Sequence, residues 1–195
     1  MRISRICRYV QLLRIVISSM LLIGCSTSST VHQTRPSHSL PTPASLGYAL
    51  NAQQLMTVDV GDKAQRIVMA LEVDQQQLVL AGFSSFGLPL FQISWDGITL
   101  NNTLHIEGID GLPDAKQVLL DIMLVLWPRE SLQTWLNDTA TTMTENKAAR
   151  QIERNGEVML EIRYRHHTDV DGVIDVYRPE VEMGYQLTTI FWEKS

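Results

Sequence analysis

The stretch from Asp114 to Trp127, "DAKQVLLDIMLVLW", constrains the fold more than any other part of the chain. Its length and the prolines on either side of it, Pro113 and Pro128, predict a helix. Within 118–127 only Asp121 is polar, so the helix would be apolar on nearly every side. Such a helix cannot lie on a surface with one face in water, and other elements must therefore enclose it.

A second helix is expected directly after the first. Pro128 suits a first helical turn, and in the following "RESLQTWL" the residues Leu132, Trp135 and Leu136 recur at the spacing of one helix face. Trp127 and Trp135 could stack on a ligand, but two tryptophans at helical positions are more typical of a core.

Strand patterns precede the two helices. The segments 66–73 and 77–83 are short apolar runs rich in branched residues. Phe91, Ile93 and Trp95 alternate with polar residues, which indicates a strand with one buried face.

The same pattern returns after the helices, where "VMLEIRYR" at 158–165 alternates between apolar and polar residues. Hairpin dipeptides occur at Asp96-Gly97, Asn155-Gly156 and Asp171-Gly172. Short strands with close turns predict an antiparallel meander. The order of strands, two helices and strands therefore predicts an α+β fold, in which a curved antiparallel sheet packs both helices in its concave side.

The first 24 residues have the layout of a secretory signal peptide, with four arginines and no acid before a short apolar core at 15–23. A helix that crosses a bilayer needs about 20 apolar residues, and this core is shorter. Leu22-Ile23-Gly24-Cys25 resembles the lipobox of bacterial lipoproteins. The alternatives are an uncleaved anchor and an ordinary signal peptide with a coincidental cysteine.

The lipobox resemblance implies that Cys25 carries a diacylglyceryl group and that cleavage occurs just before it. The new amine would then be acylated, for instance with palmitate. Ser26 in place of an aspartate implies the outer membrane, with the domain facing the periplasm. Two or three acyl chains hold a protein on a membrane without a spanning helix, because each buried methylene contributes about 0.8 kcal/mol.

Cleavage would leave an acidic chain. The loss of four arginines lowers Lys+Arg from 16 to 12 against 21 Asp+Glu, so the net charge falls from −5 to −9. This charge excludes nucleic acid as a partner and leaves little general attraction to anionic lipid head groups. Residues 25–45 are rich in Ser, Thr and Pro and predict a flexible linker. A single domain at 46–195 is expected to follow it.

Five features of this domain resemble an uncharacterised family of bacterial lipoproteins that carries a domain of unknown function. They are "LGYALNAQQLMTV" from Leu46, the helix end Leu126–Pro128, Arg150 near the Asn-Gly hairpin, "EIRY" at Glu161–Tyr164 and "GYQL" at Gly184–Leu187. The resemblance covers nearly the whole mature domain. It implies no activity, because none is assigned to the family.

The layout also resembles the outer-membrane lipoprotein receptor LolB and its periplasmic partner, the carrier LolA. Those proteins have an open antiparallel half-barrel lidded by helices, with an apolar cavity for acyl chains, and the resemblance implies the same architecture here. A loop of LolB carries an Asn-Pro-Leu-Gly sequence whose protruding leucine helps to insert cargo into the membrane. Phe86 occupies the corresponding place in Ser84–Pro89, although the Asn-Pro pair is absent.

Phe86 and Leu88 fall in a turn between two expected strands. Turns usually face water, where two large apolar residues together are unexpected. Either the two side chains fold back onto the core as a staple, or they contact lipid.

These observations lead to a hypothesis of binding and carriage. We expect an outer-membrane lipoprotein that binds acyl chains or related lipids in an apolar groove and assists lipid or lipoprotein handling. The family resemblance adds aryl-polyene-type lipids to the expected cargo. The candidate groove lining is Phe91, Ile93, Trp95, Leu120, Leu124 and Trp127. The alternative is a structural or scaffolding envelope lipoprotein with a packed core, which recruits protein partners through its rim.

Motifs for catalysis are absent from the sequence. Gly82–Phe86 lacks the final glycine of a nucleophile elbow, and no phosphate loop, dinucleotide fingerprint or Cys/His ligand set occurs. His166 and His167 with Asp169 and Asp171 suggest a metal site, but adjacent histidines on a strand point to opposite faces. The sequence therefore predicts no enzyme, no catalytic residue, no metal and no cofactor.

Overall fold

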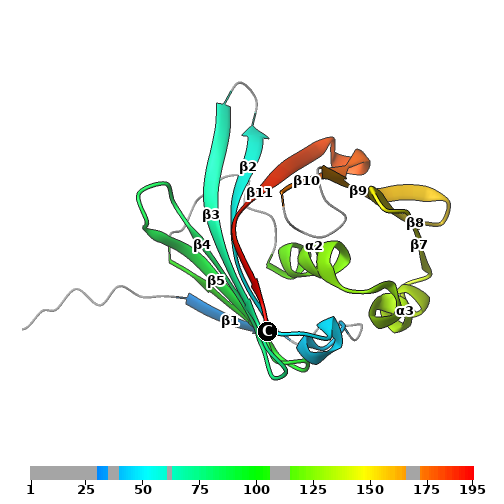
Figure 1. Cartoon of the computed structure of the whole chain (residues 1–195), viewed down its shortest axis with the longest axis horizontal. Helices are drawn as coiled ribbons and strands as arrows, with labels where there is room; N and C mark the ends of the chain where they lie inside the picture. Colours follow the sequence, from blue (N-terminus) through cyan, green and yellow to red (C-terminus); the bar gives the residue numbers. More distant parts are fainter. Residues whose placement is uncertain (1–29, 35–39, 61–62, 106–114, 166–171) are drawn as a thin grey trace, which may run out of the picture.

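A single curved sheet encloses two helices in the computed structural model, which describes residues 30–34, 40–60, 63–105, 115–165 and 172–195 (Figure 1). The strands before the helices are β1 (Thr30–Thr34), β2 (Leu50–Val60), β3 (Lys63–Val73), β4 (Leu78–Phe83), β5 (Pro89–Trp95) and β6 (Leu100–Leu104). The helices are α2 (Ala115–Leu126) and α3 (Arg129–Asp138). The strands after them are β7 (Thr141–Glu145), β8 (Ala149–Arg154), β9 (Glu157–Arg165), β10 (Val173–Arg178) and β11 (Met183–Lys194). Two short 3-10 helices are η1 (Pro43–Leu46) and η2 (Pro179–Val181).

The described strands form one eleven-stranded sheet in the order β1-β6-β5-β4-β3-β2-β11-β10-β9-β8-β7. Each neighbouring pair is antiparallel, and β1 and β7 form separate edges, so the sheet is open. The sheet curves around α2, and α3 lies beside β7 (Figure 1). The predicted α+β fold, an open half-barrel with two helices in its concave side, is confirmed.

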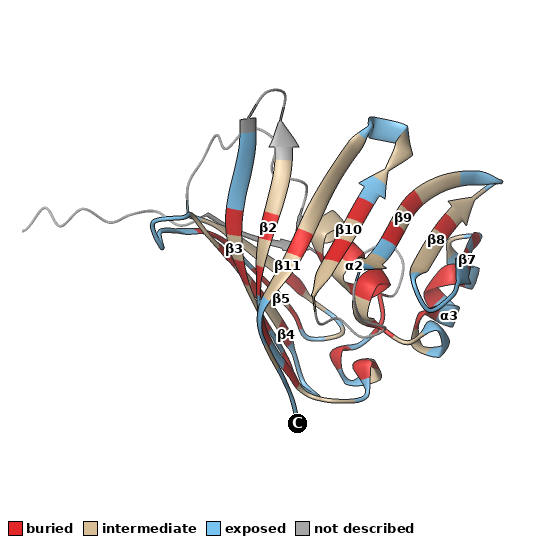
Figure 2. Ribbon diagram, turned by 45° about the horizontal axis from the view of Figure 1, so that its top comes forward, coloured by how far each residue is buried: buried red, intermediate tan, exposed pale blue. Residues whose placement is uncertain are grey.

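The last strand joins the two halves of the sheet. β11 pairs with β2 from Tyr185 opposite Val58 to Lys194 opposite Leu50, with a bulge between Thr189 and Phe191. Without this pairing β2–β6 and β7–β10 would be separate meanders. The buried residues lie along the inward faces of the strands and on α2 (Figure 2).

The segment predicted as a flexible linker is partly ordered. Thr30–Thr34 forms β1 on the edge of β6, and Leu40 and Leu46 are buried in the core. Part of the segment for which the sequence predicted a linker thus packs against the core. We call residues 40–46 the N-terminal strap.

Two buried tryptophans explain why the N-terminal strap packs against the domain. The indole N–H of Trp95 donates to the Pro41 carbonyl oxygen over 2.9 Å. The indole N–H of Trp127 donates to Ser45 Oγ over 2.9 Å and to the Thr42 carbonyl oxygen over 3.2 Å. A buried indole N–H needs an acceptor, and the strap supplies acceptors for both.

Candidate functional site

The concave side of the sheet is occupied by α2, whose side chains are buried on several faces. Leu119, Met123 and Leu124 lie in the core, while Val118 and Ile122 are half-buried against it. This arrangement confirms that the apolar helix is enclosed, and it makes the contacts of α2 the centre of any site in the half-barrel.

Arg150 of β8 holds the C-terminal end of α2. One guanidinium nitrogen donates to the carbonyl oxygens of Leu124 and Trp127, each over 2.8 Å, and of Val125 over 3.3 Å. The guanidinium also forms an ion pair of 3.0 Å with Glu145. The last carbonyl groups of a helix have no partners within it and carry negative partial charge, so a cation satisfies both needs.

Tyr164 of β9 makes a further contact with the same end of the helix. Its hydroxyl group donates to the Val125 carbonyl oxygen over 2.8 Å. Burial raises the pKa of Tyr164 to about 12, with Arg150 acting in the opposite direction. The hydroxyl group therefore keeps its proton, and remains a donor, at any physiological pH.

Asp121 joins the middle of α2 to β10 and β11. Only 3% of this residue is exposed. Its carboxylate pairs with Arg178 and accepts hydrogen bonds from the Tyr185 hydroxyl group over 3.1 Å and the Gln117 amide over 2.9 Å. Burial raises the pKa of Asp121, although Arg178 and the hydrogen bonds act to lower it.

Burial also raises the pKa of Tyr185 well above its usual value, and the Asp121 carboxylate adds to this shift. The Nε of Arg178 is buried and has no hydrogen-bond partner in the described part of the chain. Asp121, Arg178 and Tyr185 thus form a desolvated polar cluster inside an apolar half-barrel. We call it the Asp121 cluster.

Three of the segments that carry the family resemblance meet at α2. Arg150 and Tyr164 hold its end, and Tyr185 of the "GYQL" segment holds its middle. The sequence does not reveal that these three residues contact the same helix, because they lie on three different strands. Their shared function in the structure is to fix α2 in the concave side.

A small cavity lies between the sheet and α2. It measures about 30 Å³, which is roughly the room that two water molecules need. Its apolar lining is Met56, Met69, Leu71, Leu80, Leu187, Val118 and Ile122, and its polar lining is Gln54, Asp121 and Tyr185. We call it the sheet–helix cavity.

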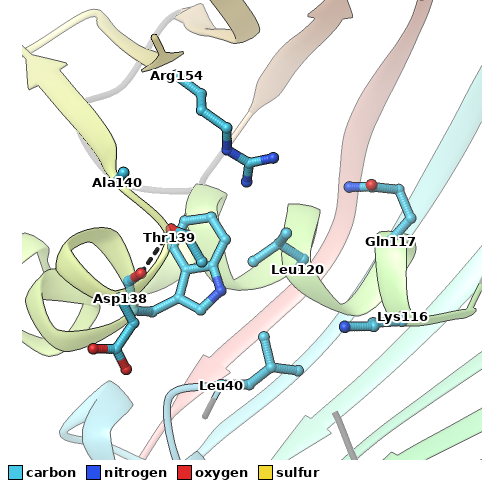
Figure 3. Close-up of a pocket in the computed structure, with 9 residues that line it drawn as sticks. Leu40, Lys116, Gln117, Leu120, Asp138, Thr139, Ala140 and Arg154 are labelled. Carbon is cyan, nitrogen blue, oxygen red and sulfur yellow. Dashed lines mark hydrogen bonds between the residues drawn. The ribbon is translucent and has the colours of Figure 1, made fainter. Parts of the chain in front are cut away.

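A larger pocket of about 710 Å³ lies on another side of α2 (Figure 3). Its walls come from α2, the end of α3, the end of β8 and the N-terminal strap. Leu120, Trp135 and Leu40 supply apolar surface, and Lys116 and Arg154 supply positive charge. We call it the α2–α3 pocket.

The predicted groove residues fall into two groups. Phe91, Ile93, Trp95, Leu124 and Trp127 are all buried in the core and line neither of these two spaces. Leu120 is half-buried and lines the α2–α3 pocket. A different set of residues therefore lines the sheet–helix cavity, on β2, β3, β4, β11 and α2.

The turn between β4 and β5 presents its apolar residues to solvent. Phe86 is 92% exposed and Leu88 is 57% exposed. The Ser84 hydroxyl oxygen accepts the backbone N–H groups of both residues over 3.3 and 3.1 Å, and Gly87 takes a positive φ of 78°. The turn thus holds Phe86 outward, and the two side chains do not form a staple on the core.

Other predicted features lie outside the described residues. They include Cys25 and the histidine and aspartate group at 166–171. Among the described residues, no three or more His, Cys, Asp or Glu side chains gather as a metal site would require. None of the described helices combines the length and the hydropathy needed to cross a membrane.

The geometry defines a class of protein: an open antiparallel half-barrel whose concave side fixes an apolar helix through charged and hydroxyl groups. Residues 51–189 match the family model "Protein of unknown function (DUF3261)", and the chain belongs to that family. The expected membership of an uncharacterised family is therefore confirmed. No curated protein matches the sequence.

Proposed function

We propose that this protein is an outer-membrane lipoprotein, anchored through acyl chains on Cys25, that binds acyl chains or related lipids between its sheet and α2. The domain would face the periplasm and assist lipoprotein or lipid handling, in the manner of the LolB and LolA proteins that its layout resembles. Aryl-polyene-type lipids are included in the proposed cargo. The lipobox at residues 22–25 and the family membership support this proposal.

The sheet–helix cavity is the observation that carries the proposal. Seven of its ten lining residues are apolar, and two of these, Met56 and Met69, have flexible side chains that adapt to different shapes. Burial of a hydrocarbon chain there is worth about 25 cal/mol per Å² of apolar surface. The space of about 30 Å³ is smaller than a lipid chain needs, so binding requires α2 to move.

The contacts of α2 favour a pivoting movement. The polar contacts described above that join it to the strands begin at Asp121 and continue to Trp127. The proposed movement displaces the part of α2 that lines the cavity while Arg150 and Tyr164 keep its C-terminal end in place. Such a lid widens the cavity without unfolding the domain.

The anchor is tested by replacing Cys25 with serine. A serine hydroxyl group does not accept the diacylglyceryl group. We therefore expect the variant to leave the outer-membrane fraction and to appear as precursor that is either soluble or retained in the inner membrane. Fractionation, with mass measurement of the mature N-terminus, checks this result. If the variant remained in the outer membrane at wild-type abundance, the lipid anchor would be refuted.

Chain binding is tested with a fluorescent polyene fatty acid and the full mature chain carrying Cys25→Ser. We expect saturable binding by this protein and at least tenfold weaker binding, about 1.4 kcal/mol, after Val118→Trp, because the larger ring fills the sheet–helix cavity. Ile98→Trp is the matched control, since Ile98 is exposed in the β5–β6 turn. A folded wild-type protein that showed no saturable uptake would contradict the proposal.

The scaffolding alternative has one specific observation in its favour. Five of the six predicted groove residues fill the core, and the cavity between sheet and helix is small. If the protein is a scaffold, the exposed side chains of Phe86 and Leu88 would contact a protein rather than lipid. Recovery of one stoichiometric partner, bound equally by wild type and Val118→Trp, would favour this alternative.

A further inference from the structure

The α2–α3 pocket has the size of a ligand site. Its volume of about 710 Å³ falls within the roughly 300–1,000 Å³ that small-molecule pockets occupy. It differs from the sheet–helix cavity in position and chemistry, and it needs no movement of α2 to admit a molecule.

Arg154 places a positive charge on the inward face of β8. It shares this face with Arg150 and with the buried Ile152, because alternate residues of a strand point to the same side. Arg150 pairs with helix carbonyl groups, whereas the described hydrogen bond of Arg154 is one contact of 3.4 Å from Nε to Thr141 Oγ1. No described carboxylate forms an ion pair with Arg154.

The guanidinium group of Arg154 points into the pocket (Figure 3). Lys116 and Gln117, from the first turn of α2, point into it from the facing wall. Asp138 also lines the pocket, but its carboxylate points away from both cations (Figure 3). Two cations thus face a common space in a chain whose net charge is −5.

Apolar surface lies directly beside these cations. Leu40 and Trp135 are each 4% exposed and Leu120 is half-buried, and all three line the pocket. The carbon surface that these three side chains leave accessible suits contact with an alkyl chain, and the indole N–H of Trp135 is a further donor for a polar end. Positive charge on two facing walls, with apolar surface beside it, matches an amphiphile.

We propose that the α2–α3 pocket binds a single-chain amphiphile with an anionic head group. The alkyl chain lies against Leu40, Leu120 and Trp135, and the head group pairs with Arg154 and Lys116. A guanidinium fork matches the oxygen atoms of a carboxylate or a phosphate, so either head group satisfies the site. The site is separate from the sheet–helix cavity and goes beyond the function proposed above.

Calorimetric titration of the full mature chain carrying Cys25→Ser tests the site. The probes are dodecanoate, dodecyl phosphate and the uncharged monolauroylglycerol, each below its micelle concentration. We expect at least one anionic probe to bind about tenfold or more tightly than the uncharged probe, and comparison of the two anionic probes separates a carboxylate head from a phosphate head. Equal binding of all three probes, or no binding, would overturn the proposal.

Charge variants link the preference to the pocket. Arg154→Met should weaken binding of the anionic probe about tenfold and leave the uncharged probe unchanged. Arg163→Met removes the same charge from an exposed side chain of β9 and should change neither. If Arg154→Met does not fold, the same measurement is made with Lys116→Met, which removes the charge on the facing wall. Wild-type binding of the anionic probe by a folded variant at either position would refute the assignment.

The two proposed sites are distinguished by a single variant. Val118→Trp fills the sheet–helix cavity and should leave anionic amphiphile binding intact, because Val118 lines only the smaller of the two spaces described above. Loss of the Arg154-dependent binding in this variant would show that the probe occupies the sheet–helix cavity, and it would overturn the separate site.

Discussion

Replacement of Trp127 by alanine is expected to lower the free energy of unfolding by about 3–5 kcal/mol. The side chain is fully buried where α2 meets the N-terminal strap, and its removal leaves a large void. The two acceptors in the strap, Ser45 Oγ and the Thr42 carbonyl oxygen, also lose their donor. Native domains are stable by only about 5–15 kcal/mol, so this single change removes a large part of the total.

Urea denaturation of wild type and variant measures this difference directly. Trp127→Phe keeps an aromatic ring but cannot donate a hydrogen bond, so we expect it to lose about 1–3 kcal/mol. Trp192→Ala serves as the matched control, because Trp192 is only half-buried on β11. A loss at Trp127 no larger than the loss at Trp192 would refute the structural role of this junction.

The two helices and the inward strand faces could be predicted because they depend on local patterns. An apolar run between two prolines indicates an enclosed helix, and α2 spans Ala115–Leu126 as expected. The order of the strands depends on long-range pairing. The contact of β11 with β2 joins residues more than a hundred positions apart, and no local pattern specifies it.

The sequence also does not tell which of the candidate groove residues line a space and which fill the core. Alternation identifies Phe91, Ile93 and Trp95 as inward-facing, and the structure agrees. It does not tell whether the space opposite an inward side chain is filled. Near β5 the space is filled, and for Trp95 the N-terminal strap supplies a hydrogen-bond acceptor, although the composition of that segment predicted a linker.

The inward arginines of β8 could have been found from the sequence. In the structure the Asn155-Gly156 turn closes the hairpin with Arg154 opposite Glu157, and a bulge then brings Ile152 opposite Leu160 on β9. Because Ile152 must face the core, Arg150 and Arg154 must share its face. Two cations on an inward face conflict with simple polar patterning, and such conflicts tend to mark functional positions. One of them holds α2, and the other faces the α2–α3 pocket.

Asp121→Asn is expected to destabilise the domain by about 3–5 kcal/mol, because it leaves the buried guanidinium group of Arg178 without a counter-charge. The side chain of Arg178 is 13% exposed, so water compensates little for the loss.

The double variant Asp121→Leu with Arg178→Met removes both charges and replaces them with apolar groups. We expect it to recover most of the lost stability, because a buried ion pair contributes little net free energy. Denaturation of the three proteins at pH 7 checks this order. A double variant less stable than Asp121→Asn would contradict it.

The pH dependence of stability gives an independent test of the Asp121 cluster. Burial raises the pKa of Asp121 in the folded state above its usual 3.8, so the folded protein binds this proton more tightly than the unfolded chain does. The resulting stabilisation is fully present below pH 3.8 and is lost as the pH rises through the folded-state pKa. The stability of wild type relative to the double variant should therefore fall across this window and then level off. A relative stability that rose with pH would mean that attraction to Arg178 outweighs burial and lowers the pKa, because the folded state would then favour the carboxylate.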